Sequence, residues 1–310
     1  CDNSCNQTGT GLNVAACPGT DTVLCNAPVL DACGNVCGST GTGYDAAQCP
    51  DAVTVLCASQ VTYQCGNPCG AVGTLCPGSS VCGDSGCLDP GQGPENPGLS
   101  CLDVVAKGFG AGDGVYWIDP DGAAGDGAFQ VWCDMTNGGW TLVLKLSDND
   151  TSSFKYDSGQ WSSSEPINSD SLDPDDNVTM KSQAYSTVPF TEIRMDMGSL
   201  GNSLKENISR DAARDLFTGG HVNSSYGRTD FFNWVDEPSN FWDTQPHCNV
   251  HGFNVTNSSA KCRYGISMNN EGDCNSNDSW VGLGCHHLSA GAVSWNPGAT
   301  YARQAWVFVR

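Results

Sequence analysis

A run of oxygen-bearing side chains stands near the carboxyl end of the chain, in the stretch NNEGDCNSND of residues 269–278. Carboxylate and amide oxygens come at short intervals along it, from Glu271, Asp273, Asn275 and Asp278. The alternation Asp273-X-Asn275-X-Asn277 is typical of calcium loops, in which every other residue turns inward. Asn and Asp also favour turns, so a solvated surface loop explains the same residues equally well. The full EF-hand pattern is absent, and Asn277 also begins a glycosylation sequon.

Other candidates for chemistry are weaker. His287 and the histidine before it follow a cysteine and could touch an ion or a ligand, although a surface or hydrogen-bonded histidine is more common. The aromatic run of residues 231–234 could stack on sugars, but such rings more often fill cores. The sequence lacks GxSxG, HExxH and a P-loop, so we expect no enzymatic activity.

The net charge of the chain limits the classes of partner that it can bind. Its 310 residues carry a net charge of −21, and all 13 Lys and Arg lie between Lys107 and Arg310. So acidic a chain repels polyphosphate, which argues against nucleic acid and favours hard cations such as Ca²⁺. Its apolar runs are far shorter than the roughly 20 residues that cross a bilayer, so no transmembrane segment is expected.

The cysteines and sequons indicate a secreted or cell-surface protein. Nineteen cysteines are typical of an oxidising compartment. Chance would give about 4 Asn-X-Ser/Thr sequons in a chain of this composition. The chain has more than that, at Asn6, Asn149, Asn177, Asn207, Asn223, Asn254, Asn257 and Asn277. Together they favour an N-glycosylated protein of a eukaryotic secretory pathway, whereas Cys1 at the start leaves a bacterial lipoprotein open.

The first 87 residues form a cysteine repeat. The cysteines of residues 1–32 recur in residues 33–64, each 32 positions further on, and a shortened third unit spans residues 65–87. Each unit has few large apolar residues, so disulfides must stabilise it, and we expect a stalk of small modules. Cys87 is the thirteenth cysteine, and because that number is odd, one must pair outside this segment or stay free.

A linker and a larger domain follow. Residues 88–100 hold three prolines and three glycines, which indicates a linker. Residues 101–310 contain all nine tryptophans and can build a core. Strands are predicted at VYWI, FQVWC, WTLVLKL, EIRMDM and QAWVFVR, and a helix at SRDAARDLF with Ser209 as its N-cap. We predict an α+β domain with short sheets and long loops.

The opening of this domain resembles a fibrinogen-related domain, through Cys101, GVYWIDPDG, FQVWCDM and GGWTLV. The later part is similar to the intelectin branch, through Asn269-Asn270-Glu271 followed by Cys274 and a glycine-rich strand. The resemblance implies a Cys101–Cys133 disulfide and a fold with calcium-stabilised loops. It also implies that Asn269 and Glu271 bind a sugar-holding Ca²⁺, although Gly272 stands where the family has a histidine.

Further site residues follow from the same resemblance. Asp148 and Asp150 stand after the GGWTLV strand, where relatives bind an ion. Trp295 and Tyr301 would supply aromatic walls for a glycan, with His287 as a further contact, but their spacing differs from that of the family.

Two functions remain open from the sequence. The first is an extracellular glycoprotein whose calcium-binding head recognises glycans or glycoproteins. The second is a structural subunit of an extracellular filament, hair or coat, which assembles with itself through the cysteine-rich stalk. The repeated modules and the odd cysteine suit the second function, and so does the histidine missing at Gly272.

Overall fold

The computed structural model describes residues 80–83, 86–122, 125, 127–236, 245–257, 260–295 and 298–310, together with two short strands near the amino terminus. The chain divides into two compact units, Cys1–Asn96 and Pro97–Arg310. In the first unit, β1 (Val29–Leu30) pairs with β2 (Val36–Cys37), and β3 (Val81–Gly83) pairs with β4 (Gly86–Leu88). The predicted repeats of residues 1–87 lie almost wholly outside the described residues.

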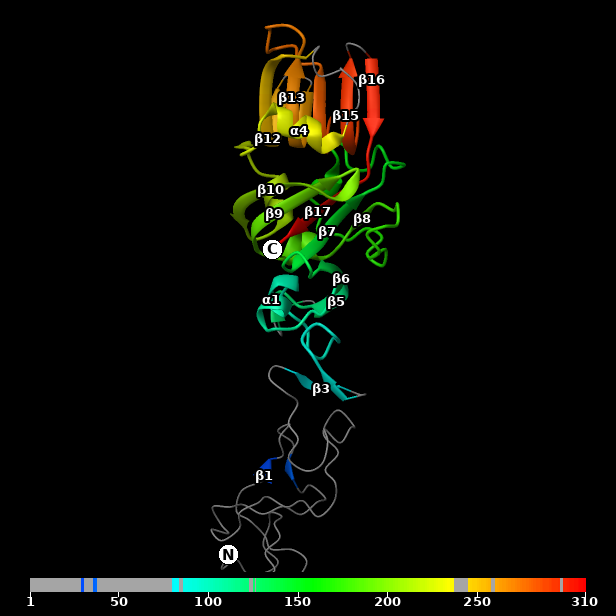
Figure 1. Cartoon of the computed structure of the whole chain (residues 1–310), viewed down its shortest axis with the longest axis vertical. Helices are drawn as coiled ribbons and strands as arrows, with labels where there is room; N and C mark the ends of the chain where they lie inside the picture. Colours follow the sequence, from blue (N-terminus) through cyan, green and yellow to red (C-terminus); the bar gives the residue numbers. More distant parts are fainter. Residues whose placement is uncertain are drawn as a thin grey trace, which may run out of the picture. The chain divides into compact units, whose positions relative to one another are not determined.

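The second unit contains two sheets in which every ladder is antiparallel (Figure 1). The seven-stranded sheet has the order β10-β9-β17-β7-β6-β5, with β8 beside β7. Its strands are β5 (Gly114–Ile118), β6 (Phe129–Asp134), β7 (Trp140–Leu146), β8 (Met180–Lys181), β9 (Phe190–Met197), β10 (Ser199–Arg210) and β17 (Ala305–Val309). The last strand therefore lies in the middle of the sheet, between β9 and β7.

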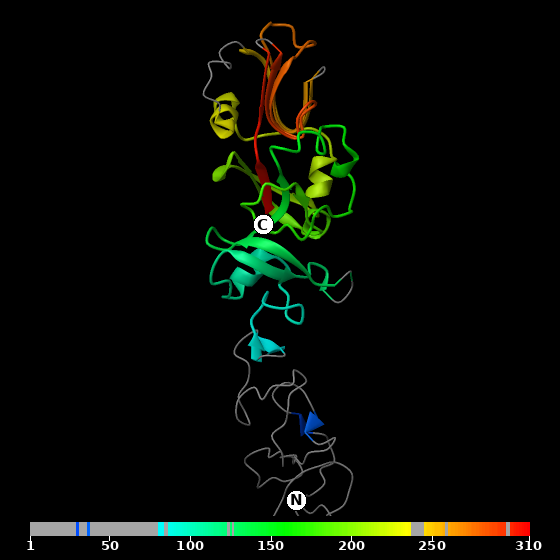
Figure 2. The same cartoon turned by 90° about the vertical axis from the view of Figure 1, so that its right-hand side faces the viewer.

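The six-stranded sheet follows chain order from β11 to β16. Its strands are β11 (Val222–Asn223), β12 (His247–Asn257), β13 (Ala260–Asn269), β14 (Ser279–Leu283), β15 (Ala290–Trp295) and β16 (Gly298–Ala302). The helices are α1 (Cys101–Ala106), α2 (Ala184–Thr187), α3 (Ala213–Phe217), α4 (Arg228–Val235) and the 3-10 turn η2 (Gly159–Trp161). Figure 2 shows α4 beside one face of this sheet.

The unit is mostly β-sheet with a few short helices, so the α+β prediction holds only in part. The five predicted strands are confirmed as β5, β6, β7, β9 and β17. The predicted helix was placed too early. Ser209 still belongs to β10, and α3 begins at Ala213 after an extended Ala212. The region of β12 to β16, for which the sequence predicts long loops with one glycine-rich strand, forms a sheet instead.

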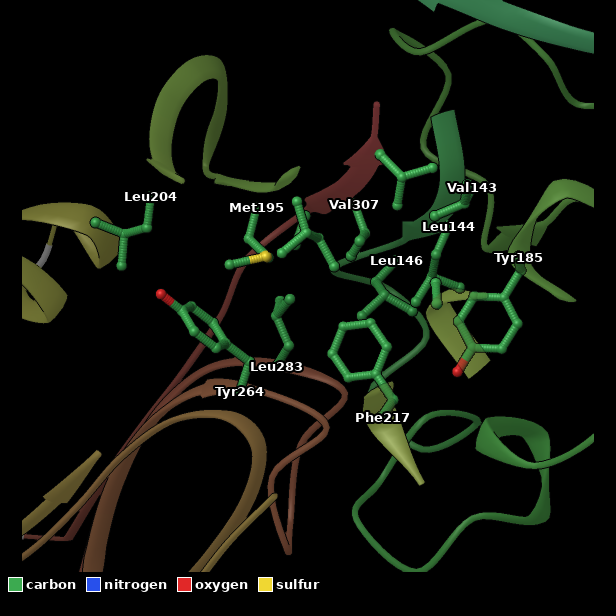
Figure 3. Close-up of a cluster of buried hydrophobic side chains, with 14 of the residues drawn as sticks. Val143, Leu144, Leu146, Tyr185, Met195, Leu204, Phe217, Tyr264, Leu283 and Val307 are labelled. Atoms are coloured by element: carbon green, nitrogen blue, oxygen red, sulfur yellow. The ribbon is translucent and has the colours of Figure 1, made fainter. Parts of the chain in front are cut away.

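The hydrophobic core lies between the two sheets (Figure 3). Leu144, Met195 and Val307 point inward from the seven-stranded sheet, toward Tyr264 and Leu283 of the other sheet. Phe217 of α3 and Tyr185 of α2 close one side of this core. Burial of this many large apolar side chains is the main favourable term that holds the sheets together.

Three buried cations lie on the seven-stranded sheet, and two of them tie loops to it. Lys145 is fully buried and donates to the carbonyl oxygens of Ser171 and Asp173 and to the carboxylate of Asp176. Lys181 is also fully buried, and its Nζ donates to the carbonyl oxygens of Gln160 (2.9 Å) and Ser163 (2.8 Å). These lysines satisfy loop carbonyls that would otherwise lie near apolar side chains without a donor.

The third cation is Arg194 on β9. Its Nη1 donates to Asp134 Oδ2 at 2.7 Å, and its Nε lies 3.2 Å from Asp196 Oδ1. The guanidinium carbon lies 4.0 Å from the ring centre of Phe308 and 5.2 Å from that of Trp140. All three charged residues are less than 5 % exposed, so each compensates the desolvated charge of the others.

A row of glycines crosses four adjacent strands of the six-stranded sheet. Gly252, Gly265, Gly282 and Gly291 are paired in succession across β12, β13, β14 and β15. A Cβ added to any of them would lie about 2 Å from a carbonyl oxygen of a neighbouring strand, 2.1 Å for Gly282 and 1.9 Å for Gly291. Only glycine permits this approach of the backbones, because it has no Cβ.

All six cysteines after residue 100 form disulfides with one another. They pair as Cys101–Cys133, Cys248–Cys274 and Cys262–Cys285. The first joins α1 to β6, next to the amino-terminal segment in which Gly98 N donates to Trp117 O at 3.1 Å. Cys248–Cys274 ties the start of β12 to the turn before β14, and Cys262–Cys285 ties β13 to the segment just after β14.

Candidate functional site

The predicted cation loop is the connection between β13 and β14. β13 ends at Asn269 and β14 begins at Ser279, so residues 270–278 form the turn of an antiparallel hairpin. The Cys248–Cys274 disulfide fastens this turn to the start of β12. A polar connection of this length therefore has a fixed position on the sheet.

Two amide oxygens in this loop are buried and accept no hydrogen bond. Asn269 is fully buried, and its Nδ2 donates to Asp273 O at 2.6 Å and to Ser276 Oγ at 3.1 Å. Its Oδ1 has no hydrogen-bond partner, and neither has the buried Oδ1 of Asn270. Buried carbonyl oxygens without a partner are rare, and a cation or an ordered water would satisfy them.

The acidic side chains of the loop point elsewhere. Asp273 Oδ1 accepts hydrogen bonds from the backbone and side-chain nitrogens of Asn275, at 3.0 and 3.1 Å. The bond from the Asn275 backbone lowers the pKa of Asp273 below its usual value. Asp278 Oδ1 accepts from Ser279 Oγ at 2.8 Å, and Glu271 is exposed. Within the described part of the chain, no three His, Cys, Asp or Glu side chains converge as a metal site.

The second predicted ion site lies after β7. Asp148 Oδ1 accepts from Asn177 Nδ2, and Asp150 Oδ1 accepts from the backbone nitrogens of Ser152 and Ser153. Burial raises the pKa of Asp150, but the hydrogen bonds from Ser153, Thr179 and Ser152 together outweigh it, so the pKa lies below its usual value. These contacts close the turn from residue 148 to residue 153.

The predicted glycan contacts lie on separate elements. Tyr301 is half-buried on β16 and packs against the core, and the side chain of Trp295 lies outside the described residues. His287 is exposed, and its ring centre lies 5.3 Å from that of Trp280 and 4.4 Å from that of His286. Desolvation and the neighbouring His286 lower the pKa of His287. Both effects favour the neutral form of this histidine.

The sequence analysis missed a pair of carboxylates after β5. Desolvation raises the pKa of Asp119, and the hydrogen bond and charge of Asp121 raise it further. Asp119 Oδ1 is buried without a hydrogen-bond partner. Two carboxylates this close attract a proton or a cation. The Asp-Pro-Asp spacing is visible in the sequence, within the motif GVYWIDPDG.

Residues 87–196 match the family model of the fibrillar collagen C-terminal domain. The matched stretch contains the Cys101–Cys133 disulfide and most of the strands of the seven-stranded sheet. None of the described helices is long and apolar enough to cross a membrane. The matched family differs from the fibrinogen-related proteins that the sequence resembles, and the match gives no support for the intelectin branch. Over residues 87–196, the chain is similar to the C-terminal domain of fibrillar collagens.

Proposed function

We propose that the chain is a building block of an extracellular structural assembly. The observation that carries this proposal is the match of residues 87–196 to the fibrillar collagen C-terminal domain, a family named for fibril-forming proteins. The cysteine-rich first unit would link copies or partner glycoproteins, and the second unit would be the folded head. The proposal favours the structural hypothesis of the sequence analysis over glycan recognition.

The number of cysteines in each unit supports covalent assembly. The six cysteines of the second unit are all paired with one another. The 13 cysteines up to Cys87 therefore cannot pair with a cysteine of the second unit, and 13 is an odd number. At least one cysteine of the first unit therefore has no partner within these 310 residues, and we propose that it bonds to a second copy of the chain.

Electrophoresis of the chain secreted from eukaryotic cells tests this assembly. Without reductant, we expect disulfide-linked oligomers, and with reductant they should collapse to one band. Alkylation before denaturation, followed by mass spectrometry, is the control, because it detects free thiols. A secreted monomer carrying one alkylated cysteine would rule out covalent assembly.

The proposal includes Ca²⁺ as a structural ion of the loop between β13 and β14. The two buried amide oxygens of Asn269 and Asn270 support it, since Ca²⁺ takes oxygen ligands, including amide carbonyls. The ion would fix the loop and supply no chemistry of reaction. Ca²⁺ at 100 times its Kd should stabilise the head by about 2.7 kcal/mol.

A thermal melt with Ca²⁺ and with EDTA measures that effect. We expect EDTA to lower the Tm of the native chain but not that of Asn269→Leu. Glu271→Gln, at an exposed position, tests whether the carboxylate contributes a ligand. An unchanged Tm in EDTA, with no metal detected by elemental analysis, would contradict the calcium proposal while leaving the assembly proposal intact.

Glycan recognition is the second candidate, and it has less support. Of its three predicted contacts, Tyr301 packs against the core and His287 stacks with other rings. A glycan array with and without chelator decides between the functions. Binding that disappears with chelator would favour the lectin function over a purely structural head.

A further inference from the structure

Seven of the eight sequons lie within the described residues, and they differ in exposure. Four have exposed asparagines, at Asn149, Asn177, Asn207 and Asn223. Asn257 is half-buried, whereas Asn254 is 4 % exposed and Asn277 is fully buried. A sequon identifies a candidate only by its residue types, so the structure adds a criterion that the sequence lacks.

The two buried asparagines use the nitrogen that a glycan would occupy. Asn254 Nδ2 donates to the carbonyl oxygens of Leu216 (2.8 Å) and Gly220 (3.3 Å), which holds the end of α3 against β12. Asn277 Nδ2 donates to Cys248 O (3.1 Å) and Ser267 Oγ (2.8 Å). A sugar on either nitrogen would remove a donor from a buried site and has no space there.

Two of the exposed sequons stand where the edges of the two sheets meet. Asn207 lies on β10, the edge strand of the seven-stranded sheet, and Asn223 lies on β11, the edge strand of the six-stranded sheet. Glu206 joins these edges, because its carboxylate accepts from Ser224 Oγ and from the nitrogen and hydroxyl of Ser225. Asn207 is therefore next to Glu206 in the chain, and Asn223 is next to Ser224, the hydrogen-bond partner of Glu206.

We propose that Asn207 and Asn223 carry N-linked glycans that shield the joined edges of both sheets, while Asn254 and Asn277 remain unmodified. This inference rests on the extracellular location in the proposed function. In the modification, an oligosaccharide donor linked to a lipid diphosphate reacts with the amide. The amide nitrogen bonds to the anomeric carbon and loses one proton, and the bond from that carbon to the diphosphate breaks.

Shielding has a physical reason. Edge strands present unpaired backbone groups and pair with strands of other molecules unless something blocks them. On β10, the Lys205 backbone nitrogen already donates to Tyr226 Oη at 3.0 Å, so the loop after β11 covers part of that edge. Glycans on Asn207 and Asn223 would cover the remainder. The opposite edges, β5 and β16, carry no sequon.

Peptide mapping of the secreted full chain tests the occupancy. Enzymatic release of N-glycans in heavy-oxygen water converts each glycosylated Asn to a labelled Asp. We expect the label at Asn207 and Asn223 and none at Asn254 or Asn277. Label at either buried position in folded protein would overturn the inference, and so would two bare edge asparagines.

Variants test the shielding. Asn207→Gln and Asn223→Gln should each remove the mass of one glycan, and the double variant should shift toward larger species in sedimentation velocity. The control is Thr256→Ala, which destroys the sequon of Asn254 at an exposed position and should leave the glycan mass unchanged.

Native trimming with an endoglycosidase repeats the shielding test without any substitution. If neither the double variant nor the trimmed protein associates more than the native chain, the glycans do not shield the edges. Disulfide-linked oligomers on a non-reducing gel are a separate readout. The proposed assembly therefore stands or fails independently of this inference.

Discussion

Replacing Arg194 by methionine should be among the most damaging single changes in the second unit. Methionine fills a similar volume against Phe308 and Trp140, whose ring centres lie 4.0 and 5.2 Å from the guanidinium carbon. The charge is lost, however. Asp134 and Asp196 then remain 4 % and 0 % exposed without their cation.

The size of the stability loss depends on the hydrogen bonds that the two carboxylates keep. Breaking a buried ion pair by removing one partner costs about 3–5 kcal/mol. Asp196 still accepts from Gly201 N and Ser203 Oγ, and Asp134 still accepts from Asn137. We therefore expect the lower end, about 3 kcal/mol. For a unit of this size, that lowers Tm by about 6–12 °C.

Urea unfolding followed by tryptophan fluorescence measures this loss, because every tryptophan lies in the second unit. The matched control is Arg210→Met, since Arg210 is half-exposed and donates to the carbonyl of the residue before it. It should change stability by less than about 0.5 kcal/mol. Adding Asp134→Asn to Arg194→Met should restore about 1–2 kcal/mol. A loss below about 1 kcal/mol in the single variant would refute a compensating role for Arg194.

Three further predictions follow from single contacts. Burial lowers the pKa of Lys181 to about 8, so from pH 8 to its ordinary value of 10.5 the unfolded chain binds more protons. The free energy of unfolding should rise with pH by about 1–3 kcal/mol in that window, and urea titrations of Lys181→Met should lack this rise. Gly282→Ala should cost about 2–4 kcal/mol in the same assay, whereas Gly272→Ala, with nothing near its Cβ, should be neutral. Replacing Cys248 and Cys274 by serine should cost about 2–4 kcal/mol and speed amide exchange in residues 270–278.

The strands that sequence predicted are those that lie near the centre of their sheet or carry many apolar residues. β7, with the sequence WTLVLKL, is buried along its whole length, and its sequence alone predicts a strand without knowledge of the neighbouring strands. β10, with the sequence SLGNSLKENISR, is an edge strand and mostly polar, so its last residues resemble the start of a helix. An edge strand needs few apolar residues, because one of its neighbours is solvent or a loop.

The six-stranded sheet shows a different limit of sequence reasoning. Gly252, Gly265, Gly282 and Gly291 suggest loops when each is taken alone, because glycine weakens a strand. Each is required because a neighbouring strand approaches within about 2 Å of where a Cβ would lie, and Gly252, Gly282 and Gly291 also have a positive φ. That requirement concerns pairs of residues on different strands, and a single sequence does not specify those pairs.

The sequence predicted where the candidate site lies in the chain, but not how its side chains are arranged. The polar run of residues 269–278 predicted a loop with cation ligands, and the loop lies at the turn of the β13–β14 hairpin. Asn269 and Asn277 are nevertheless fully buried, and the exposed Asp273 is engaged with its own loop. Asn and Asp favour exposed turns by residue type, but burial depends on which strand and disulfide lie opposite.

An extracellular building block must associate at chosen contacts and nowhere else. A net charge of −21 makes copies of the chain repel one another, within a screening length of about 8 Å at physiological ionic strength. The proposed glycans at Asn207 and Asn223 would block two sheet edges, where uncontrolled strand pairing would otherwise begin. A disulfide acts at a single point and is insensitive to this repulsion once it has formed. The proposed disulfide would therefore link copies of such an acidic chain more specifically than a broad noncovalent surface would.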